Sequence, residues 1–154
     1  MKKLLALVMC AAVMLIGGSA WAHSYQQGDI RIGHIWTRAT PLGATTAAIY
    51  VPFLNTGKER DRLISASTSL ADKVEIHEEV KDGGMMKMQK LDAITLEPNV
   101  PVSLRPGGIH LMVFGLKQPL KEGEMLPLTL QFEKAGIAKV DVMIESVGAM
   151  SGAH

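Results

Sequence analysis

The 154-residue chain has one cysteine, few aromatic residues and almost no net charge. A single cysteine excludes a disulfide framework and a cysteine-based zinc cluster. A formal net charge of +1 lacks the basic excess that a nucleic-acid partner requires. Hydrophobic residues are 47% and charged residues 20%, a balance that excludes intrinsic disorder. The residue type in excess is methionine, with ten copies.

The first 22 residues have the pattern of a secretory signal peptide. Two lysines precede an apolar run, residues 4–16, which is too short to span a bilayer. Ala20-Trp21-Ala22 then places small residues on either side of a large one, so we expect cleavage after Ala22 and export to the periplasm. Cys10 is not expected to be a lipidation site, because Met9 before it is not small. The chain that remains would contain no cysteine and all five histidines.

Period-two alternation of apolar residues predicts an all-β fold, with half-buried strands at 126–132 and 138–144. Turn motifs separate the candidate strands, and no stretch has the pattern of a long amphipathic helix. Roughly seven to nine short strands at this spacing favour a sandwich or small barrel. We expect one β domain at 23–147 and a loose C-terminal tail at 148–154. The other candidate strands are 30–36, 45–53, 62–66, 74–80, 85–91 and 110–116.

The turn between 74–80 and 85–91 decides what lies across from His77. If Asp82-Gly83 forms the turn, Met88 lies directly opposite His77, about 5 Å away between Cβ atoms. If Gly83-Gly84 forms the turn, Met88 lies diagonal to His77 but on the same face. In either register the two side chains are close enough to bind one metal ion.

Strand parity also places these side chains away from the core. Val74 and Ile76 have core-like parity, so His77 belongs to the other face, on which Glu75 and Glu79 attract a cation or simply solvate the surface. Further along the chain, His110 and Met112 are two residues apart and therefore share a face of their own strand. The sequence thus contains two His–Met pairs. A glycine-rich turn at 82–84 separates His77 from Met88, and another at 106–108 precedes His110 and Met112.

Two imidazoles and two thioethers form a coherent ligand set for one Cu(I) ion. Thioether sulfur is soft and neutral and selects Cu(I) over harder metals, while a blue-copper site would need a thiolate. Zinc more often recruits Cys, His or carboxylate. Taken singly, each of the four residues is at least as compatible with core packing or an ordinary surface position as with metal binding. Together they predict a site that holds Cu(I) and hands it on, formed by His77, Met88, His110 and Met112.

The spacing of these four residues resembles the signature of the periplasmic CuA-chaperone family, PCuAC. Ten residues separate His77 from Met88, twenty-one separate Met88 from His110, and one separates His110 from Met112. The resemblance implies a cupredoxin-like Greek-key β-barrel without the cupredoxin cysteine. It also implies delivery of copper to the CuA centre of cytochrome c oxidase, alone or beside a thioredoxin-like copper protein. Further similar segments are 35–41, Tyr50, 61–63, 104–112 and 128–136.

The chain departs from many family members in one position, because Glu78 stands where they carry methionine after the first histidine. By strand parity Glu78 points away from His77, so we expect the four ligands to be undisturbed. Met86 shares the parity of Met88 and is an alternate ligand or a packing residue, whereas Met85 should face the other way.

The expected mature termini carry a second, weaker possibility. An α-amine and imidazole at His23 could bind Cu(II) together with Met150 and His154, although a disordered tip is the favoured interpretation. His34 is assigned no role.

Three functions remain open on these grounds. The favoured one is a non-enzymatic Cu(I) chaperone, from which periplasmic copper buffering or tolerance cannot be separated, since both use the same site. A copper-dependent oxidoreductase would need an open coordination position and a nearby acid or base, and no such motif is apparent. A β-sandwich interaction module, with methionines that only pack, would bind no copper.

Overall fold

The computed structural model describes residues 24–152; the predicted signal peptide (1–22), His23 and His154 lie outside this range. The described residues form thirteen β-strands. None of them forms a helix long and apolar enough to cross a membrane. The strands are β1 (Tyr25–Gln27), β2 (Ile30–Ile32), β3 (Trp36–Arg38), β4 (Thr46–Tyr50), β5 (Pro52–Asn55), β6 (Asp61–Ser67), β7 (Lys73–Asp82), β8 (Met85–Leu91), β9 (Ile94–Leu96), β10 (Val102–Ser103), β11 (Ile109–Phe114), β12 (Met125–Phe132) and β13 (Gly136–Glu145).

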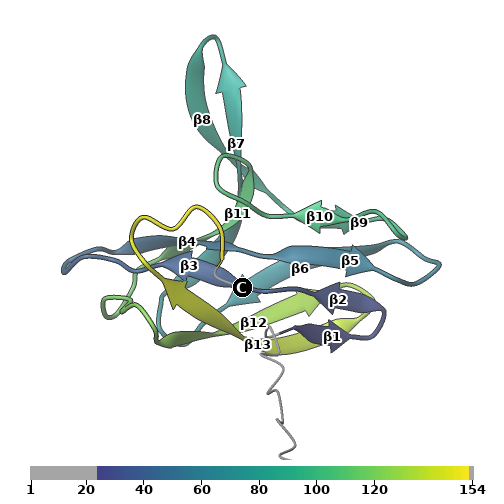
Figure 1. Ribbon diagram of the computed structural model, residues 1–154. Helices are drawn as coiled ribbons and strands as arrows, with labels where there is room; N and C mark the ends of the chain where they lie inside the picture. The colour runs from purple at the N-terminus through teal and green to yellow at the C-terminus, as the bar shows by residue number, and fades with distance from the viewer. Residues whose placement is uncertain (1–23, 153–154) are drawn as a thin grey trace, which may run out of the picture.

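The strands form two sheets that enclose one hydrophobic core (Figure 1). One sheet has the order β1-β2-β5-β10 and the other β8-β7-β11-β4-β3-β13-β12-β6-β9. Phe53 of the small sheet and Phe132 of the large sheet meet edge to face, with ring centroids 5.7 Å apart. The predicted alternation on β12 and β13 is confirmed, because every second residue is buried. The all-β fold class is therefore confirmed.

The predicted single strand at 45–53 is two strands in the structure, β4 and β5, which belong to different sheets. Val51 between them is fully buried, and its carbonyl accepts a hydrogen bond from the Leu104 amide. A chain that crosses from one sheet to the other must change its hydrogen-bonding partners there, which an apolar pattern does not reveal. The strands missed by the pattern, β1, β9 and β10, have only two or three residues each.

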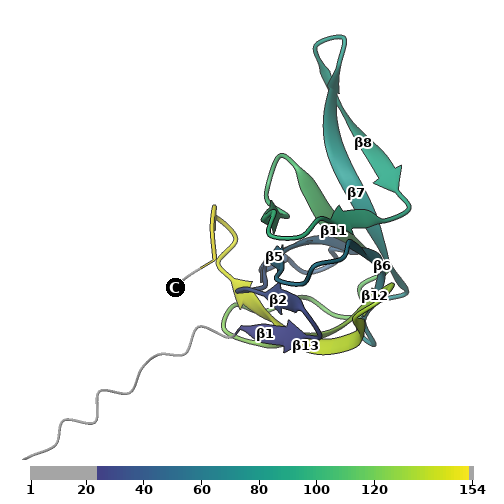
Figure 2. The same ribbon diagram turned by 90° about the vertical axis from the view of Figure 1, so that its right-hand side faces the viewer.

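The hairpin of β7 and β8 projects out of the body of the molecule, as both views show (Figures 1 and 2). Its turn is Gly83-Gly84, because Asp82 pairs with Met85. Both glycines have positive φ, 58° and 84°, as a two-residue type I′ turn requires. The first of the two predicted turns, Asp82-Gly83, is therefore wrong. The observed turn has glycine, which enters the left-handed region without steric cost, at both central positions.

Candidate metal-binding site

Two of the predicted ligands, His77 and His110, are direct cross-strand partners on β7 and β11. Their ring centroids are 6.1 Å apart. The neighbouring pair, Ile76 and Leu111, is buried in the core at 4% and 0% exposure. Because successive residues of a strand point to opposite faces, both imidazoles lie on the face away from the core. We call this the His–Met face, after His77, His110, Met112 and Met88.

Both predicted methionine ligands share the His–Met face. Met112 follows His110 by two residues and is the cross-strand partner of Glu75. Met88 pairs with Glu79, and Lys90 is the residue directly opposite His77. Met88 is therefore diagonal to His77, and the usual geometry of a sheet puts the Cα atoms of such a pair about 7–8 Å apart. The structure thus brings the four residues to one face, in the second of the two predicted registers.

Exposure increases across this face from the barrel to the hairpin. His110 is buried at 4% exposure, the His77 side chain is 14% exposed, and Met112 is half-buried. Met88 on the projecting hairpin is 58% exposed. Within residues 24–152, no group of three or more His, Cys, Asp or Glu side chains is arranged to hold a metal ion. The thioether side chains of Met88 and Met112 share this face with the histidine pair.

Glu75 holds the imidazole of His77 at one nitrogen. Its Oε2 lies 2.9 Å from Nε2 of His77. Its Oε1 accepts hydrogen bonds from the ammonium groups of Lys73, at 2.9 Å, and Lys90, at 3.3 Å. The His77 contact first, and then the two lysines, lower the pKa of the Glu75 carboxyl from 4.5 to about 2. Glu75 is therefore ionised at any pH at which the histidines can bind metal.

His110 is held by the backbone of the loop that precedes β11. Its Nδ1 lies 3.1 Å from the carbonyl oxygen of Gly108, which also accepts the Glu79 amide at 3.2 Å. Gly107 has φ of 80°, so glycine is needed there to turn the chain toward β11. The ring of Tyr50 meets that of His110 edge to face, at 6.5 Å between centroids. Burial raises the pKa of the Tyr50 hydroxyl.

A cluster of Trp36, Tyr50 and Arg38 borders the histidine pair, and sequence reasoning gave it no role beyond its likeness to family positions. The two rings are 4.7 Å apart, and the Arg38 guanidinium lies 5.7 Å from each centroid. Arg38 also donates to the Ala149 carbonyl at 2.7 Å and approaches the Met150 sulfur at 4.0 Å. The described part of the predicted loose tail, 148–152, thus contacts β3.

The remaining predicted residues take different positions. Met86 lies on the His–Met face opposite Lys81, one step farther from His77 than Met88, and it is 55% exposed. Met85 has the opposite parity. Glu78 pairs with Ile109 and points away from His77, in accordance with its parity. The Nε2 atom of His34 lies 3.3 Å from the Glu145 carboxylate, and His34 is not a partner of either histidine in the sheet.

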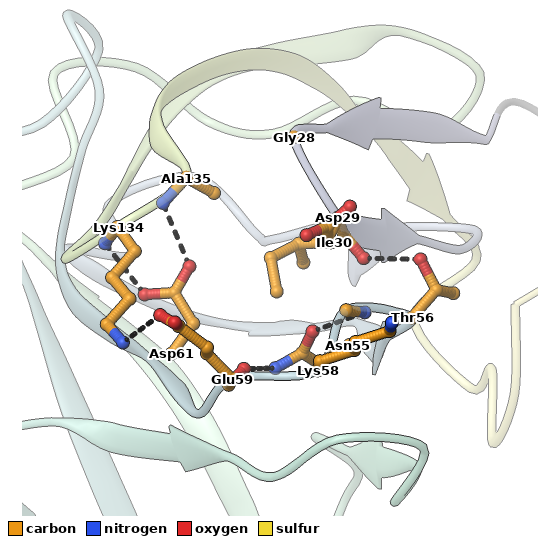
Figure 3. A pocket seen from close by; sticks show the side chains of 11 residues that line it. Gly28, Asp29, Ile30, Asn55, Thr56, Lys58, Glu59, Asp61, Lys134 and Ala135 are labelled. Carbon is orange, nitrogen blue, oxygen red and sulfur yellow. Dashed lines mark hydrogen bonds and ion pairs between the residues drawn. The ribbon is translucent and has the colours of Figure 1, made fainter.

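A cavity elsewhere in the molecule is lined by residues from β2, the 55–59 loop and the turn after β12 (Figure 3). Two of its polar side chains, Asp61 and Asn55, hydrogen-bond to the backbone. Asp61 accepts from the backbone amides of Lys134, at 2.8 Å, and Ala135, at 2.9 Å. Asn55 donates to two backbone carbonyls. None of the four predicted ligands lines this cavity, so it is separate from the predicted metal site.

Comparison with known proteins finds structures that carry copper among those similar to this chain. The family model described as "Putative lipoprotein LpqE-like" matches residues 30–144. A lipoprotein of Leifsonia xyli subsp. xyli is 30% identical over 152 residues, which is 98% of this chain and 87% of that protein. The copper-bound PCuAC domain of PmoF2 superposes with a TM-score of 0.71 and 32% identity, over 80% of this chain and 98% of that one. The solution structure of Cu(I)-bound DR1885 from Deinococcus radiodurans has a TM-score of 0.62 and 25% identity, over 82% and 83%.

Proposed function

We propose that this chain, which belongs to the LpqE-like family and has the fold of the PCuAC copper-chaperone domains, is a Cu(I) chaperone. The observation that carries the proposal is the cross-strand pair of His77 and His110, with a methionine beside each on the same face. Structural relatives that carry copper support it, since one is a copper-bound PCuAC domain and another is a Cu(I)-bound protein.

The four ligands of the proposed site are His77, Met88, His110 and Met112. All four donors are neutral when each imidazole carries a single proton. The ligands therefore do not offset the charge of the bound ion, which favours the single charge of Cu(I) over the double charge of Cu(II). The site needs no thiolate, and a thioether does not form disulfides in an oxidising compartment. Four ligands can saturate Cu(I) and leave no open position for substrate, which makes the protein a carrier rather than an enzyme.

Exposure explains how such a site would release its ion. Three ligands are buried or half-buried, while Met88 stands on the projecting hairpin at 58% exposure. A soft donor of an acceptor protein can therefore replace the Met88 sulfur first, with the ion still held by the other three ligands. The acceptor we propose is the CuA centre of cytochrome c oxidase, reached directly or with a thioredoxin-like copper protein.

The proposed place of work is the periplasm. The relatives described as lipoproteins support export, and the sequence of residues 1–22 supports a signal peptide cleaved after Ala22. The domain would then be residues 23–147, followed by the tail at 148–154. A weak second Cu(II) site at His23, Met150 and His154 stays a prediction, since two of these residues lie outside the described range.

Copper transfer tests the proposal and separates delivery from buffering. Residues 23–154 loaded with one equivalent of Cu(I) are mixed with a purified apo CuA domain, and the metal content of each protein is measured after separation. Delivery predicts movement of copper to the CuA domain faster than an equal concentration of free Cu(I)-chelate supplies it. Tight binding without transfer would indicate buffering or tolerance. Failure to bind Cu(I) would contradict the proposed function altogether.

A further inference from the structure

The hydrogen bonds of the two histidines specify which nitrogen of each ring is free. Nε2 of His77 lies 2.9 Å from Oε2 of Glu75. An ionised carboxylate has lone pairs but no proton to donate, so Nε2 must be the donor of this hydrogen bond. In the neutral imidazole only one nitrogen carries a proton. The lone pair of His77 that can bind a metal is therefore on Nδ1.

The same reasoning gives the opposite answer for His110. Its Nδ1 lies 3.1 Å from the carbonyl oxygen of Gly108, and a carbonyl oxygen also only accepts. Nδ1 of His110 is thus the protonated nitrogen, and its free lone pair is on Nε2. The Gly108 carbonyl is fixed in place, because it also accepts the backbone amide of Glu79 on β7. One histidine is oriented by a side chain and the other by the main chain.

We propose that copper is bound through different nitrogens of the two rings, Nδ1 of His77 and Nε2 of His110, and that Glu75 is the residue that positions His77. This inference rests on the proposed function and adds to it the protonation state of each ligand and a positioning residue. Carboxylates commonly orient metal-binding histidines in this way, through the ring nitrogen that does not bind the metal.

The surroundings of Glu75 suit it to position His77 and make it a poor metal ligand. Its side chain is 18% exposed, and its Oε1 is held by Lys73 on its own strand and by Lys90 on β8. Lys90 is the direct cross-strand partner of His77, so the carboxylate is fixed from two strands. With Oε2 occupied by His77, both oxygens are engaged. The two lysine ammonium groups thus balance the charge of the Glu75 carboxylate. The proposed copper ligands, two imidazoles and two thioethers, are neutral groups.

Nitrogen-15 NMR of the unmodified protein tests the assignment directly. Long-range ¹H–¹⁵N spectra of residues 23–154 are recorded without metal and with one equivalent of Cu(I), which is diamagnetic. Without metal, we expect the proton on Nε2 in His77 and on Nδ1 in His110. With Cu(I), the large ¹⁵N shift changes should occur at Nδ1 of His77 and Nε2 of His110. A metal-induced change at Nε2 of His77 would overturn the inference.

Variants test the positioning role. Glu75→Ala should weaken Cu(I) affinity about 10–100-fold, and the proton of His77 should then distribute over both nitrogens. Glu75→Gln should lose less, because its amide oxygen can still accept from Nε2. The matched control is Glu79→Ala, which removes a carboxylate from the same face and strand and should change affinity less than about twofold.

The two proposals fail in distinguishable ways. If the unmodified protein binds no Cu(I), the proposed function is contradicted. If it binds Cu(I) and the Glu75→Ala variant binds equally well with an unchanged tautomer, the positioning role alone is contradicted. Thermal unfolding of each variant without metal shows whether it is folded, and if Glu75→Ala is not, the spectra of the unmodified protein still decide the ring nitrogens.

Discussion

His77 and His110 face each other across β7 and β11 with ring centroids 6.1 Å apart, and their hydrogen bonds engage opposite ring nitrogens. This pair lies at the base of a projecting hairpin, and a methionine accompanies each histidine on the same face. The arrangement separates two tasks. In the proposed site, the buried histidines would fix the geometry, while the exposed hairpin would offer the ligand that an acceptor reaches.

Met88, rather than its neighbour Met86, should be the hairpin ligand. Met88→Ala should reduce Cu(I) affinity at least tenfold, because it removes one of four donors. Met86→Ala should leave the affinity nearly unchanged, since Met86 lies opposite Lys81, farther from His77. The two residues have similar exposure, 55% and 58%, and so form a matched pair. Competition with a chromogenic Cu(I) chelator measures both. Equal losses for the two variants would contradict the assignment.

Cu(I) affinity should fall as the pH is lowered. An imidazole nitrogen must be free of a proton to bind metal, so protons compete with copper at both histidines. The expected measurement is a Cu(I) competition titration from pH 8 to pH 5, with a steeper fall in the unmodified protein than in His77→Ala. A flat profile would mean that imidazole nitrogen does not contribute to the site.

The stability of the metal-free protein should also depend on Glu75. Its pKa is lowered from 4.5 to about 2 in the folded protein, so the ionised carboxylate stabilises the fold at pH values above 4.5. That contribution is lost as the pH falls from 4.5 toward 2. Glu75→Gln should therefore lower the urea midpoint at pH 6, and the difference should shrink at pH 3. Glu78→Gln, on the opposite face of the strand, is the control. A difference that does not change with pH would contradict the assigned cause.

The hairpin turn requires glycine for its backbone alone. Gly83 and Gly84 have positive φ, and a Cβ on either would meet no atom within 4 Å. Alanine at either position should therefore cost roughly 1–2 kcal/mol through backbone strain. We expect faster amide exchange in β8 and weaker Cu(I) binding through Met88. Gly148→Ala, which also meets no atom within 4 Å, is the control and should change neither. Unchanged exchange in Gly84→Ala would contradict the observed turn.

The sequence predicted the parts of this molecule that depend on local pattern. The alternation on β12 and β13, the parity of His77 and the pairing of His110 with Met112 follow from the period of a strand. The family resemblance, confirmed by the model match and the PCuAC structures, supplied the cupredoxin-like topology. Which strands pair is a long-range property, so the direct contact of His77 with His110 was not predicted.

The misses have the same origin. Glu75 was left between two roles, attracting a cation or solvating the surface, because its bond to Lys90 depends on the register of β7 and β8. Two turns of equal length were possible at 82–84, and the register of β7 and β8 distinguishes them. The break at Val51 was hidden because both of its flanking strands are apolar.

X-ray absorption spectroscopy of residues 23–154 loaded with one equivalent of Cu(I) tests the central claim most directly. The account predicts one copper ion bound by two imidazole nitrogens and two thioether sulfurs, with both sulfur contributions lost in the Met88→Ala, Met112→Ala double variant. A copper environment of nitrogen and oxygen only, or one that the double variant leaves unchanged, would contradict it.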